Sequence, residues 1–345
     1  MPDIEFVGIH LLLIPVDKKG KHMVKVTVVI PNYNGIKYIG DCLESLYRLK
    51  EQELFEVLVV DNGSEDGGLE VVKKYPGVKL VQLSENTGFC HAVNVGIEKA
   101  QTPYVILLNN DTVVLEGFVK GLVDAIEQDK KMFAASAMML QWQDHDRIDD
   151  AGDQYCVLGW AYARGKGKLA SDYQKAAKIF AACGGASIYR KEILDQIGYF
   201  DENHFAYLED IDICYRAAIH GYHCYYTPAA KVLHAGSATS GSRYNEFKTT
   251  HASANSIYLI GKNMPPLQLV WNLPFLLLGF FIKTLFFYKK GMGPLYLKGL
   301  INGLHKLKTP EGRTHKVPFQ WRNLAHYLAI QAKLYKNTIT LITKH

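Results

Sequence analysis

Residues 26–35 read VTVVIPNYNG, and this stretch decides the fold of the chain. Its first part is an apolar, largely β-branched run, which is typical of a strand buried on both faces of a parallel sheet. Similar runs recur at residues 55–60, 78–83 and 104–108, and apolar residues at helical spacing lie between them. Repeated strand–helix units of this length predict an open, mostly parallel α/β sheet with helices on both faces.

Small polar and acidic residues follow each of the four predicted strands. In order along the chain these segments are PNYNG at 31–35, DNGSEDG at 61–67, ENTG at 85–88 and NND at 109–111. The carboxyl ends of parallel strands meet at one edge of a sheet, where ligands bind in open α/β folds. Each segment alone is also explained by a turn, because Asn, Asp and Gly favour turns. Taken together, the four segments predict a binding site.

The first loop argues against two common kinds of nucleotide site. It lacks the GxGxxG pattern that lets a backbone approach the pyrophosphate of a dinucleotide, and it lacks the Gly-rich basic loop expected of a sugar-nucleotide pyrophosphorylase. The ring of Tyr33 and the neighbouring amides suit stacking on a base, and Asp61 is placed to accept from a pyrimidine N3–H. Since no P-loop lysine is present, we expect a divalent metal on a diphosphate, with Asp111 as its ligand.

The motifs VVIPNYNG, VVDNGSEDG, ENTGF followed by Asn94-Val95-Gly96, and LLNNDT resemble those of family 2 glycosyltransferases with the GT-A fold. Within that family the chain is most similar to the rhamnosyltransferase-like branch, and the likeness covers about residues 24–240. The metal motif of the family, usually Asp-x-Asp, reads Asn109-Asn110-Asp111 here, and the resemblance implies Mg²⁺ or Mn²⁺ as cofactor. The expected donor-binding residues are Pro31, Asn32, Tyr33, Asn34, Asp61, Asn62, Ser64, Asn86, Gly88, Asn94, Asn109, Asn110 and Arg243.

A second block of the sequence carries the other candidates. Gly184 and Gly185 open a strand and permit close approach of an acceptor sugar, and Glu209 is expected beside that sugar. In the family the aspartate of a Glu-Asp pair takes the proton of the acceptor hydroxyl, which implies Asp210 as catalytic base. Acids at a helix N-terminus also favour the helix dipole, so a purely structural reading of the pair stays open. By the same resemblance His234 completes the metal site, although a lone histidine is more often structural.

The segment between residues 141 and 177 loses periodicity and is rich in Asp, Gly and Lys, which predicts a long irregular connection over the site. Its Trp160 and Tyr162 are candidates for stacking on an acceptor sugar, with ordinary packing as the alternative. Further along, Asp212 and Arg216 are four residues apart and are expected to pair on one face of a helix.

The last part of the chain differs in character. Residues 267–288 are apolar over about the ~20 positions that a membrane-spanning helix needs, but Gln268, Asn272 and Lys283 interrupt them. Residues 289–345 hold eleven Lys and Arg against one acid, whereas the rest of the chain carries a net charge of −5. We therefore expect a helix or helical hairpin that lies in one leaflet of a membrane, with a spanning helix and a buried core helix as the alternatives.

These observations divide the chain into an N-terminal extension (1–23), a catalytic domain (24–245) and a helical, membrane-associating region (246–345). The catalytic domain consists of a nucleotide-binding half (24–112) and an acceptor half (113–245). The extension is not expected to be a targeting signal, because acids stand where a signal peptide carries lysines. Six scattered cysteines without a CxxC pair favour a reduced interior over a disulfide framework or a zinc site.

The expected reaction is inverting transfer of a sugar from a nucleotide diphosphate donor, a dTDP- or UDP-sugar, to a glycan carried on polyprenyl diphosphate. Rhamnosyl transfer from dTDP-rhamnose rests on the resemblance alone, and a UDP-hexose donor is the alternative. We expect the protein at the cytoplasmic face of the cell membrane, with no nucleic acid as partner, and self-association stays open. Two other readings remain: a nucleotidyltransferase, which would release pyrophosphate, and a non-catalytic membrane adaptor with a degenerate transferase fold.

Overall fold

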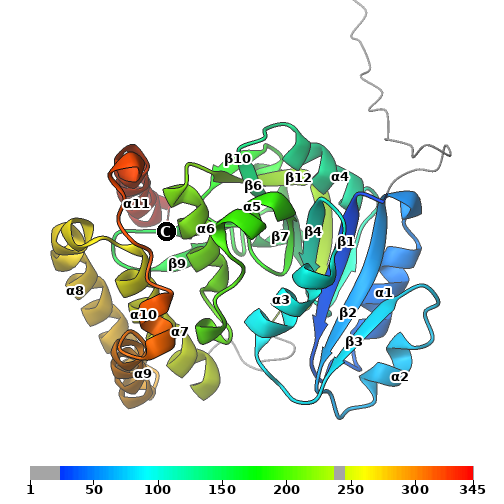
Figure 1. Ribbon diagram of the computed structural model, residues 1–345, viewed down its shortest axis with the longest axis horizontal. Helices are drawn as coiled ribbons and strands as arrows, with labels where there is room; N and C mark the ends of the chain where they lie inside the picture. Colours follow the sequence, from blue (N-terminus) through cyan, green and yellow to red (C-terminus); the bar gives the residue numbers. More distant parts are fainter. Residues whose placement is uncertain (1–23, 237–244, 345) are drawn as a thin grey trace, which may run out of the picture.

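The computed structural model describes residues 24–236 and 245–344, so the predicted extension 1–23 and Arg243 lie outside the described part of the chain. One mixed sheet has the strand order β10-β12-β6-β11-β4-β1-β2-β3, with β5 paired to β12 and β7 paired to β6 (Figure 1). The strands β8 and β9 form a separate pair. The strands are β1 (Val26–Asn32), β2 (Phe55–Asn62), β3 (Lys79–Leu83), β4 (Tyr104–Leu108), β5 (Thr112–Val114), β6 (Met132–Gln141), β7 (Asp144–Asp150), β8 (Asp153–Tyr155), β9 (Ala161–Ala163), β10 (Ala177–Ile179), β11 (Ala186–Arg190) and β12 (His223–His234).

The four strands predicted from the apolar runs are adjacent and parallel, in the order β4-β1-β2-β3, so that their carboxyl ends share one edge. Helices lie between these strands, as the apolar residues at helical spacing predicted. The helices are α1 (Ile39–Tyr47), α2 (Gly68–Val72), α3 (Phe89–Lys99), α4 (Phe118–Glu127), α5 (Lys191–Ile197), α6 (Glu209–Ile219), α7 (Glu246–Asn263), α8 (Pro266–Lys289), α9 (Gly293–Lys306), α10 (Pro310–Thr314) and α11 (Leu324–Lys344).

Helices cover both faces of the sheet, as the sequence predicted. Successive residues of a strand point to opposite faces. On β1, Val28 and Ile30 belong to one hydrophobic cluster with residues of α1, α2 and α4, whereas Val29 belongs to a second cluster with residues of α3, α5 and α6. Because both faces are buried, apolar residues occupy most positions of the central strands. The edge strand β3 is the exception, since its side chains are exposed or only half-buried.

The segment predicted as an irregular connection is built differently. It contains the hairpin strand β7, the paired strands β8 and β9, and the strand β10. The prediction was wrong there because these strands are very short or, in β7, mostly polar, and turn-forming residues separate them. The prediction of a paired Asp212 and Arg216 is confirmed: their side chains are 3.1 Å apart on α6 and both are buried.

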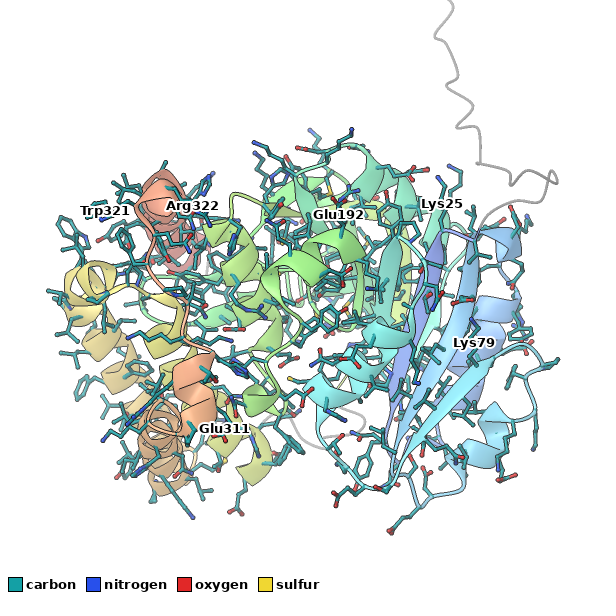
Figure 2. The ribbon with its side chains drawn as sticks, viewed as in Figure 1. Lys25, Lys79, Glu192, Glu311, Trp321 and Arg322 are labelled. Atoms are coloured by element: carbon teal, nitrogen blue, oxygen red, sulfur yellow. The ribbon has the colours of Figure 1, made fainter. Side chains whose placement is uncertain are left out.

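The C-terminal helices pack against the body of the molecule, at the opposite end from β3 (Figure 1). In Figure 2, Lys79 of β3 and Trp321 of the C-terminal region mark these two ends. Leu259 of α7, Leu276 of α8 and Leu334 of α11 belong to the same hydrophobic cluster as the residues of α3, α5 and α6. Residues on the two sides of the proposed boundary at 245 therefore share one core.

Helix α8 turns its polar residues inward. Gln268 accepts a hydrogen bond from Tyr215, and Asn272 exchanges hydrogen bonds with Gln331 of α11. Lys283 lies over the ring of Trp160, 5.6 Å from its centroid. Within the described residues α8 is the one helix whose length and apolar character suffice to cross a membrane, and only 17% of its most apolar window is buried. Its outward face is consequently apolar without interruption by these side chains.

A buried charge network joins α7 to α6. The Lys262 ammonium lies 2.6 Å from Asp201 and 2.8 Å from Asp212, and Arg216 and Asn263 also bind Asp212. Burial alone would raise the pKa of Asp201, but Lys262 outweighs it and lowers the pKa to about 2. The same opposition, with Arg216 adding to Lys262, holds the pKa of Asp212 well below 3.8. The two carboxylates are thus ionised, and their charges are balanced by cations inside the protein.

We expect Lys262→Met to destabilise the fold by about 3–5 kcal/mol, because two buried carboxylates lose their shared cation. Thermal unfolding should show this as a Tm lower by roughly 10 °C. Lys99→Met, on the exposed side of α3, is the matched control and should stay within about 0.5 kcal/mol of wild type.

The same network limits the stability of the fold at low pH. Both carboxylates have lowered pKa values, so their stabilisation is fully present above about pH 4 and is lost as the pH falls toward 2. Denaturant titrations at pH 7 and pH 3 measure this loss. An equal loss of stability in Lys262→Met and wild type between these pH values would contradict the assigned role of the lysine.

Candidate functional site

A cavity of about 830 Å³ opens where the carboxyl ends of the parallel strands face α6 and α7. Most of the residues predicted for the site line it, although they come from distant parts of the sequence. From the ends of the parallel strands these are Pro31, Asn32, Tyr33, Asn62, Asn86, Gly88, Asn109, Asn110 and Asp111, and from later parts of the chain Gly184, Gly185, Glu209, Asp210 and His234.

The first loop is held in place from behind by Asp61. The Asp61 carboxylate accepts from the Asn32 side chain at 2.9 Å and from the backbone N–H of Ser64 at 3.1 Å, and it is 3% exposed. The Ser64 hydroxyl in turn accepts from the backbone N–H of Asn34. Through these contacts Asp61 and Ser64 fix the loop that carries Tyr33.

The same loop reaches the fourth strand end through an amide pair. The Asn110 side chain donates to the Asn32 side chain at 2.7 Å. A Cβ atom on Gly35 would lie 2.1 Å from the Asn110 amide nitrogen, so only glycine allows this close approach. The hydrogen-bonded chain Asp61–Asn32–Asn110 thus links the second strand end to the residue before Asp111.

Asn62 ties the second strand end to the third. Its amide donates to the Asn86 side chain and to the carbonyl oxygen of Gly88, both at 3.1 Å. Asn94 has different contacts from those predicted: its amide binds the backbone of Phe200 and the carboxylate of Glu202, and it lies off the described wall of the cavity. Asn94 is accordingly a bridge between α3 and the segment that precedes α6.

Strand register brings His234 to Asp111. The last residues of β12 pair antiparallel with β5, and His234 lies opposite Thr112, the neighbour of Asp111. The His234 Nε2 atom is consequently 3.3 Å from the Asp111 carboxylate, and its Nδ1 atom is 2.8 Å from Asp149. A carboxylate that fixes the second nitrogen of a histidine is a common support for a metal ligand.

This pair fits a divalent cation. Asp111 supplies a hard oxygen ligand, His234 a borderline nitrogen, and both side chains reach the cavity. Burial alone would lower the pKa of His234, but the hydrogen bonds to Asp111 and Asp149 outweigh it and raise the pKa to about 9. The site therefore already stabilises positive charge between Asp111 and Asp149, which is the electrostatic condition for a bound cation.

The chain enters α6 through a strained turn. Phe205, Tyr207 and Leu208 have φ values of 60°, 73° and 66°, a region that non-glycine residues rarely adopt. The single Asn255 amide of α7 donates to the carbonyl oxygens of His204, Ala206 and Tyr207 at 2.8 to 2.9 Å. Strain of this kind persists where surrounding contacts enforce it, and here it sets the position of Glu209 and Asp210.

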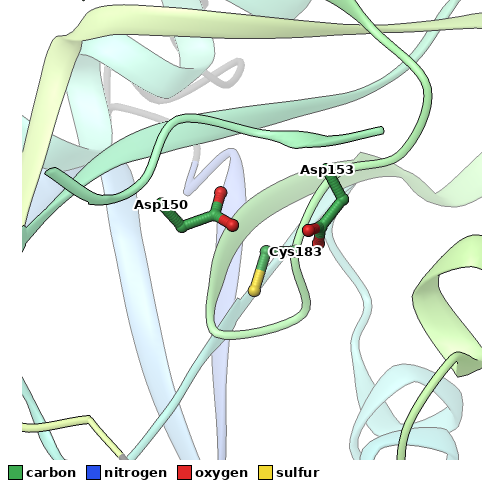
Figure 3. A group of neighbouring side chains, drawn as sticks. All are labelled: Asp150, Asp153 and Cys183. Atoms are coloured by element: carbon green, nitrogen blue, oxygen red, sulfur yellow. The ribbon is translucent and has the colours of Figure 1, made fainter. Parts of the chain in front are cut away.

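Protonatable carboxyl groups gather around Asp210. Asp150 and Asp153 come from β7 and β8 and lie near the thiol of Cys183, with ligand atoms of all three within 4.8 Å of one another (Figure 3). Burial raises the pKa of Asp150 to about 7 and that of Glu209 to about 8, and for Glu209 the neighbouring Asp210 adds to the rise. Burial also raises the pKa of Asp153 well above 3.8, and the adjacent Asp150 and Asp210 contribute. Burial raises the pKa of Asp210 in the same direction, so the whole cluster resists ionisation more than exposed carboxyl groups do.

Sequence reasoning missed three groups in or around this cavity. Asp153 lines it beside Asp210, Lys248 of α7 lines it from the C-terminal region, and Asn255 supports it from behind. The acidic run that contains Asp149 and Asp153 was a usable signal, because acids are rarely buried without a partner or a function. The sequence pattern did not single out Lys248 or Asn255, because both lie in the region that was assigned to membrane association.

Comparisons with known proteins agree with this geometry. Residues 27–198 match the family model Glycosyl transferase family 2. The chain is 27% identical over 263 residues to an N-acetylglucosaminyl-diphospho-decaprenol L-rhamnosyltransferase of Mycobacterium tuberculosis, which covers 68% of this chain and 84% of the relative. Poly-beta-1,6-N-acetyl-D-glucosamine synthase of Staphylococcus aureus is 26% identical over 59% of this chain and 48% of its own length.

Solved structures share the fold. A mannosyltransferase from Pyrobaculum calidifontis in complex with GDP-Man and Mn²⁺ superposes with a TM-score of 0.51 at 18% identity, over 93% of this chain and 88% of that chain. GalNAc-T7 with UDP, GalNAc and Mn²⁺ gives a TM-score of 0.56 at 17% identity, over 70% of this chain and 48% of that chain. Its sheet, its flanking helices and its family match place this chain in glycosyl transferase family 2 with a GT-A-like fold, and the protein is a glycosyltransferase.

Proposed function

We propose that the protein transfers a sugar, with inversion at C1, from a nucleotide diphosphate donor to a sugar carried on polyprenyl diphosphate. The observation that carries this proposal is the arrangement of the cavity, in which Asp111 and His234 lie on the described wall together with Asp210. L-rhamnose from dTDP-rhamnose is the proposed donor sugar, and a UDP-hexose is the alternative. The similarity to the mycobacterial enzyme, whose name states this sugar and a lipid-linked acceptor, supports the choice.

The residues divide the work between two sides of the cavity. Tyr33 and the amides of the first loop hold the base, and Asn109 faces the ribose. Asp61 stabilises the first loop by its hydrogen bonds to Asn32 and Ser64, and we propose that it helps to orient the base. Asp111 and His234 would hold Mg²⁺ or Mn²⁺, which supplies positive charge to the departing diphosphate when bound. Lys248 is placed to add a further positive charge on that side.

On the other side Asp210 accepts the proton of the acceptor hydroxyl while that oxygen attacks C1 of the donor sugar. The bond between C1 and the diphosphate oxygen breaks, and the electron pair leaves with the diphosphate. Burial raises the pKa of Asp210, which favours uptake of a proton, and it raises the pKa of the neighbouring Asp150, Asp153 and Glu209 as well. Gly184 and Gly185 line the same cavity and are proposed to contact the acceptor ring.

The experiment that tests this function incubates the purified protein and Mn²⁺ with dTDP-rhamnose, UDP-N-acetylglucosamine or GDP-mannose and a lipid-diphosphate-linked N-acetylglucosamine. We expect glycosylated lipid and free nucleoside diphosphate from one donor, with the anomeric configuration inverted in the product by NMR. Release of pyrophosphate would instead identify a nucleotidyltransferase. Absence of transfer and of donor hydrolysis with every sugar nucleotide would favour the adaptor reading.

We expect Asn255→Leu to lower kcat by roughly 10- to 100-fold with little change in the KM of the donor. The substitution removes the amide that holds three carbonyl oxygens of the strained turn, so Asp210 shifts relative to the acceptor. Steady-state kinetics with varied donor measure both constants. Ser256→Ala on the next helical position is the control, because its hydroxyl binds only within its own helix; an equal loss in both variants would argue against a specific role.

We also propose that the outward face of α8 docks the protein on a membrane. Leu277 and Phe281 are each 61% exposed there, and the polar residues of the helix face the protein. Exposed apolar area of this extent on one helix is typical of interfacial binding. Lys289 and Lys290 at the end of α8 are placed to meet anionic headgroups.

Vesicle flotation tests the docking face. We expect wild type to float with phosphatidylglycerol vesicles, and the double variant Leu277→Gln/Phe281→Gln to lose at least tenfold in partitioning, because two large apolar side chains no longer enter the lipid. Val24→Gln, an exposed apolar position elsewhere, should bind as wild type. If the double variant floats as wild type does, the docking face does not lie on α8.

A further inference from the structure

A second cavity, of about 780 Å³, lies between the β8–β10 segment and α11 and is strongly cationic. Five basic residues line it, and Asp172 is the only acid on its described wall. Among the ion pairs of residues 24–236 and 245–344, none joins a carboxylate to any of these five cations. The basic residues are Arg164, Lys168, Lys178, Lys333 and Lys336.

Proximity of like charges makes this cavity receptive to an anion. Burial lowers the pKa of Lys333, and repulsion from Lys178 and Lys336 adds to that effect. Arg164 is fixed by stacking on Tyr173 at 4.8 Å and by a hydrogen bond to the carbonyl oxygen of Ala151. The Lys333 ammonium donates to the carbonyl oxygen of Ile179 and is also held in place. Guanidinium and ammonium groups gathered in this way are a common arrangement for binding phosphate.

The cationic cavity adjoins the one that contains Asp210. Tyr162 of β9 contributes to the walls of both. On the partner strand β8, Asp153 lines the first cavity and its neighbour Gln154 lines the second, as alternation along a strand requires. The β8–β9 pair therefore separates an acidic cavity, where a sugar hydroxyl loses its proton, from a basic cavity beside it.

Helix α11 connects the basic cavity to helix α8. Gln331 and Tyr335 bind Asn272 and Trp271 of α8. Lys333, Lys336 and Asn337 line the cavity from the other side of the same helix. The acidic cavity, the basic cavity and α8 are thus linked through the β8–β9 pair and α11, in the order in which the sugar, diphosphate and lipid of an acceptor are joined.

We propose that this cavity between the β8–β10 segment and α11 binds the diphosphate of the lipid-linked acceptor. This assignment rests on the proposed function, because it places the anionic group of the acceptor next to the sugar that Asp210 activates. The cations would hold the diphosphate at a fixed distance from the reacting hydroxyl. The cations would also make the protein bind lipid-diphosphate-linked acceptors in preference to neutral glycosides with the same sugar.

The test compares two acceptors with the same sugar, one carried on a lipid diphosphate and one on an octyl group. In Lys168→Gln/Lys178→Gln/Lys336→Gln, we expect the KM of the diphosphate acceptor to rise at least tenfold. The KM of the octyl glycoside and the rate of donor hydrolysis should stay as in wild type. The control variant Lys74→Gln/Lys99→Gln/Lys175→Gln removes the same charge from exposed positions outside the cavity and should behave as wild type with both acceptors.

Binding of inorganic pyrophosphate by calorimetry, in EDTA to suppress the metal site, gives a second readout that needs no transfer activity. We expect wild type and the control variant to bind it and the cavity variant to lose at least tenfold in affinity. Equal KM increases for the two acceptors, or equal pyrophosphate affinity in all variants, would overturn the proposal. A cavity variant that loses only flotation with phosphatidylglycerol vesicles would assign the cations to lipid headgroups instead. Failure of wild type to transfer to either acceptor would refute the proposed function, while the calorimetry would still decide the pyrophosphate site.

Discussion

Asp210→Asn is expected to lower the rate of sugar transfer by about 10²- to 10⁴-fold while nucleotide-sugar binding stays intact. Asparagine keeps the size of the side chain and an oxygen that accepts from the backbone N–H of Ile211, a bond that Asp210 makes at 2.7 Å. It loses the basicity that the acceptor proton requires. Initial rates of transfer measure the first effect, and thermal shift with the donor and Mn²⁺ measures the second.

A matched control separates this effect from a general loss of charge. Asp195→Asn removes an exposed carboxylate on α5 that pairs with Lys191, and it should transfer at the wild-type rate. Near wild-type activity of Asp210→Asn would place the base elsewhere. Asp153 and Glu209 would then be the next carboxyl groups to replace, because both line the same cavity.

Asp111→Asn should lower transfer by about 10²-fold or more and abolish the stabilisation by Mn²⁺ plus donor. The substitution removes a negatively charged oxygen ligand, which is worth several kcal/mol of charge stabilisation if a metal binds the diphosphate. His234 would then keep a single carboxylate neighbour, Asp149. Thermal shift with donor alone, with Mn²⁺ alone and with both resolves the metal-dependent part of binding.

His234→Gln provides the companion measurement. We expect it to weaken the Mn²⁺-dependent shift in the same direction, since one of the two proposed ligands is lost. Asp146→Asn, an exposed acid on β7, serves as the control for charge near the hairpin. If Asp111→Asn and His234→Gln both retain the full Mn²⁺-dependent shift, these two residues do not bind the metal.

Local patterns predicted the sheet and its binding edge well. The runs at β1, β2, β3 and β4 and the polar residues after them are local features, and buried parallel strands followed by tight turns leave few alternatives. The segment that holds β7, β8 and β9 escaped prediction because its very short or mostly polar strands depend on pairing partners. Such pairing is set by contacts over long sequence distances, which no local pattern records.

The sequence predicted which residues belong to the site better than it predicted which neighbours each side chain contacts. The Asp61 carboxylate binds Asn32 and Ser64, and its expected contact with the donor base stays a prediction. Asp111 and His234 were expected together, and the pairing of β5 with β12 brings them to 3.3 Å; their role as metal ligands stays a prediction. The contact of Asn255 with the strained turn joins segments about fifty residues apart, so it required the structure.

The shared core of the C-terminal helices has a practical consequence for handling the enzyme. A fragment that ends near residue 245 would expose the hydrophobic cluster of α6 and would leave Asp201 and Asp212 without Lys262. Such a fragment would also lack the amide of Asn255 that shapes the turn before Asp210. A detergent-free preparation is therefore better sought by making the outer surface of α8 hydrophilic in the full-length chain than by shortening it.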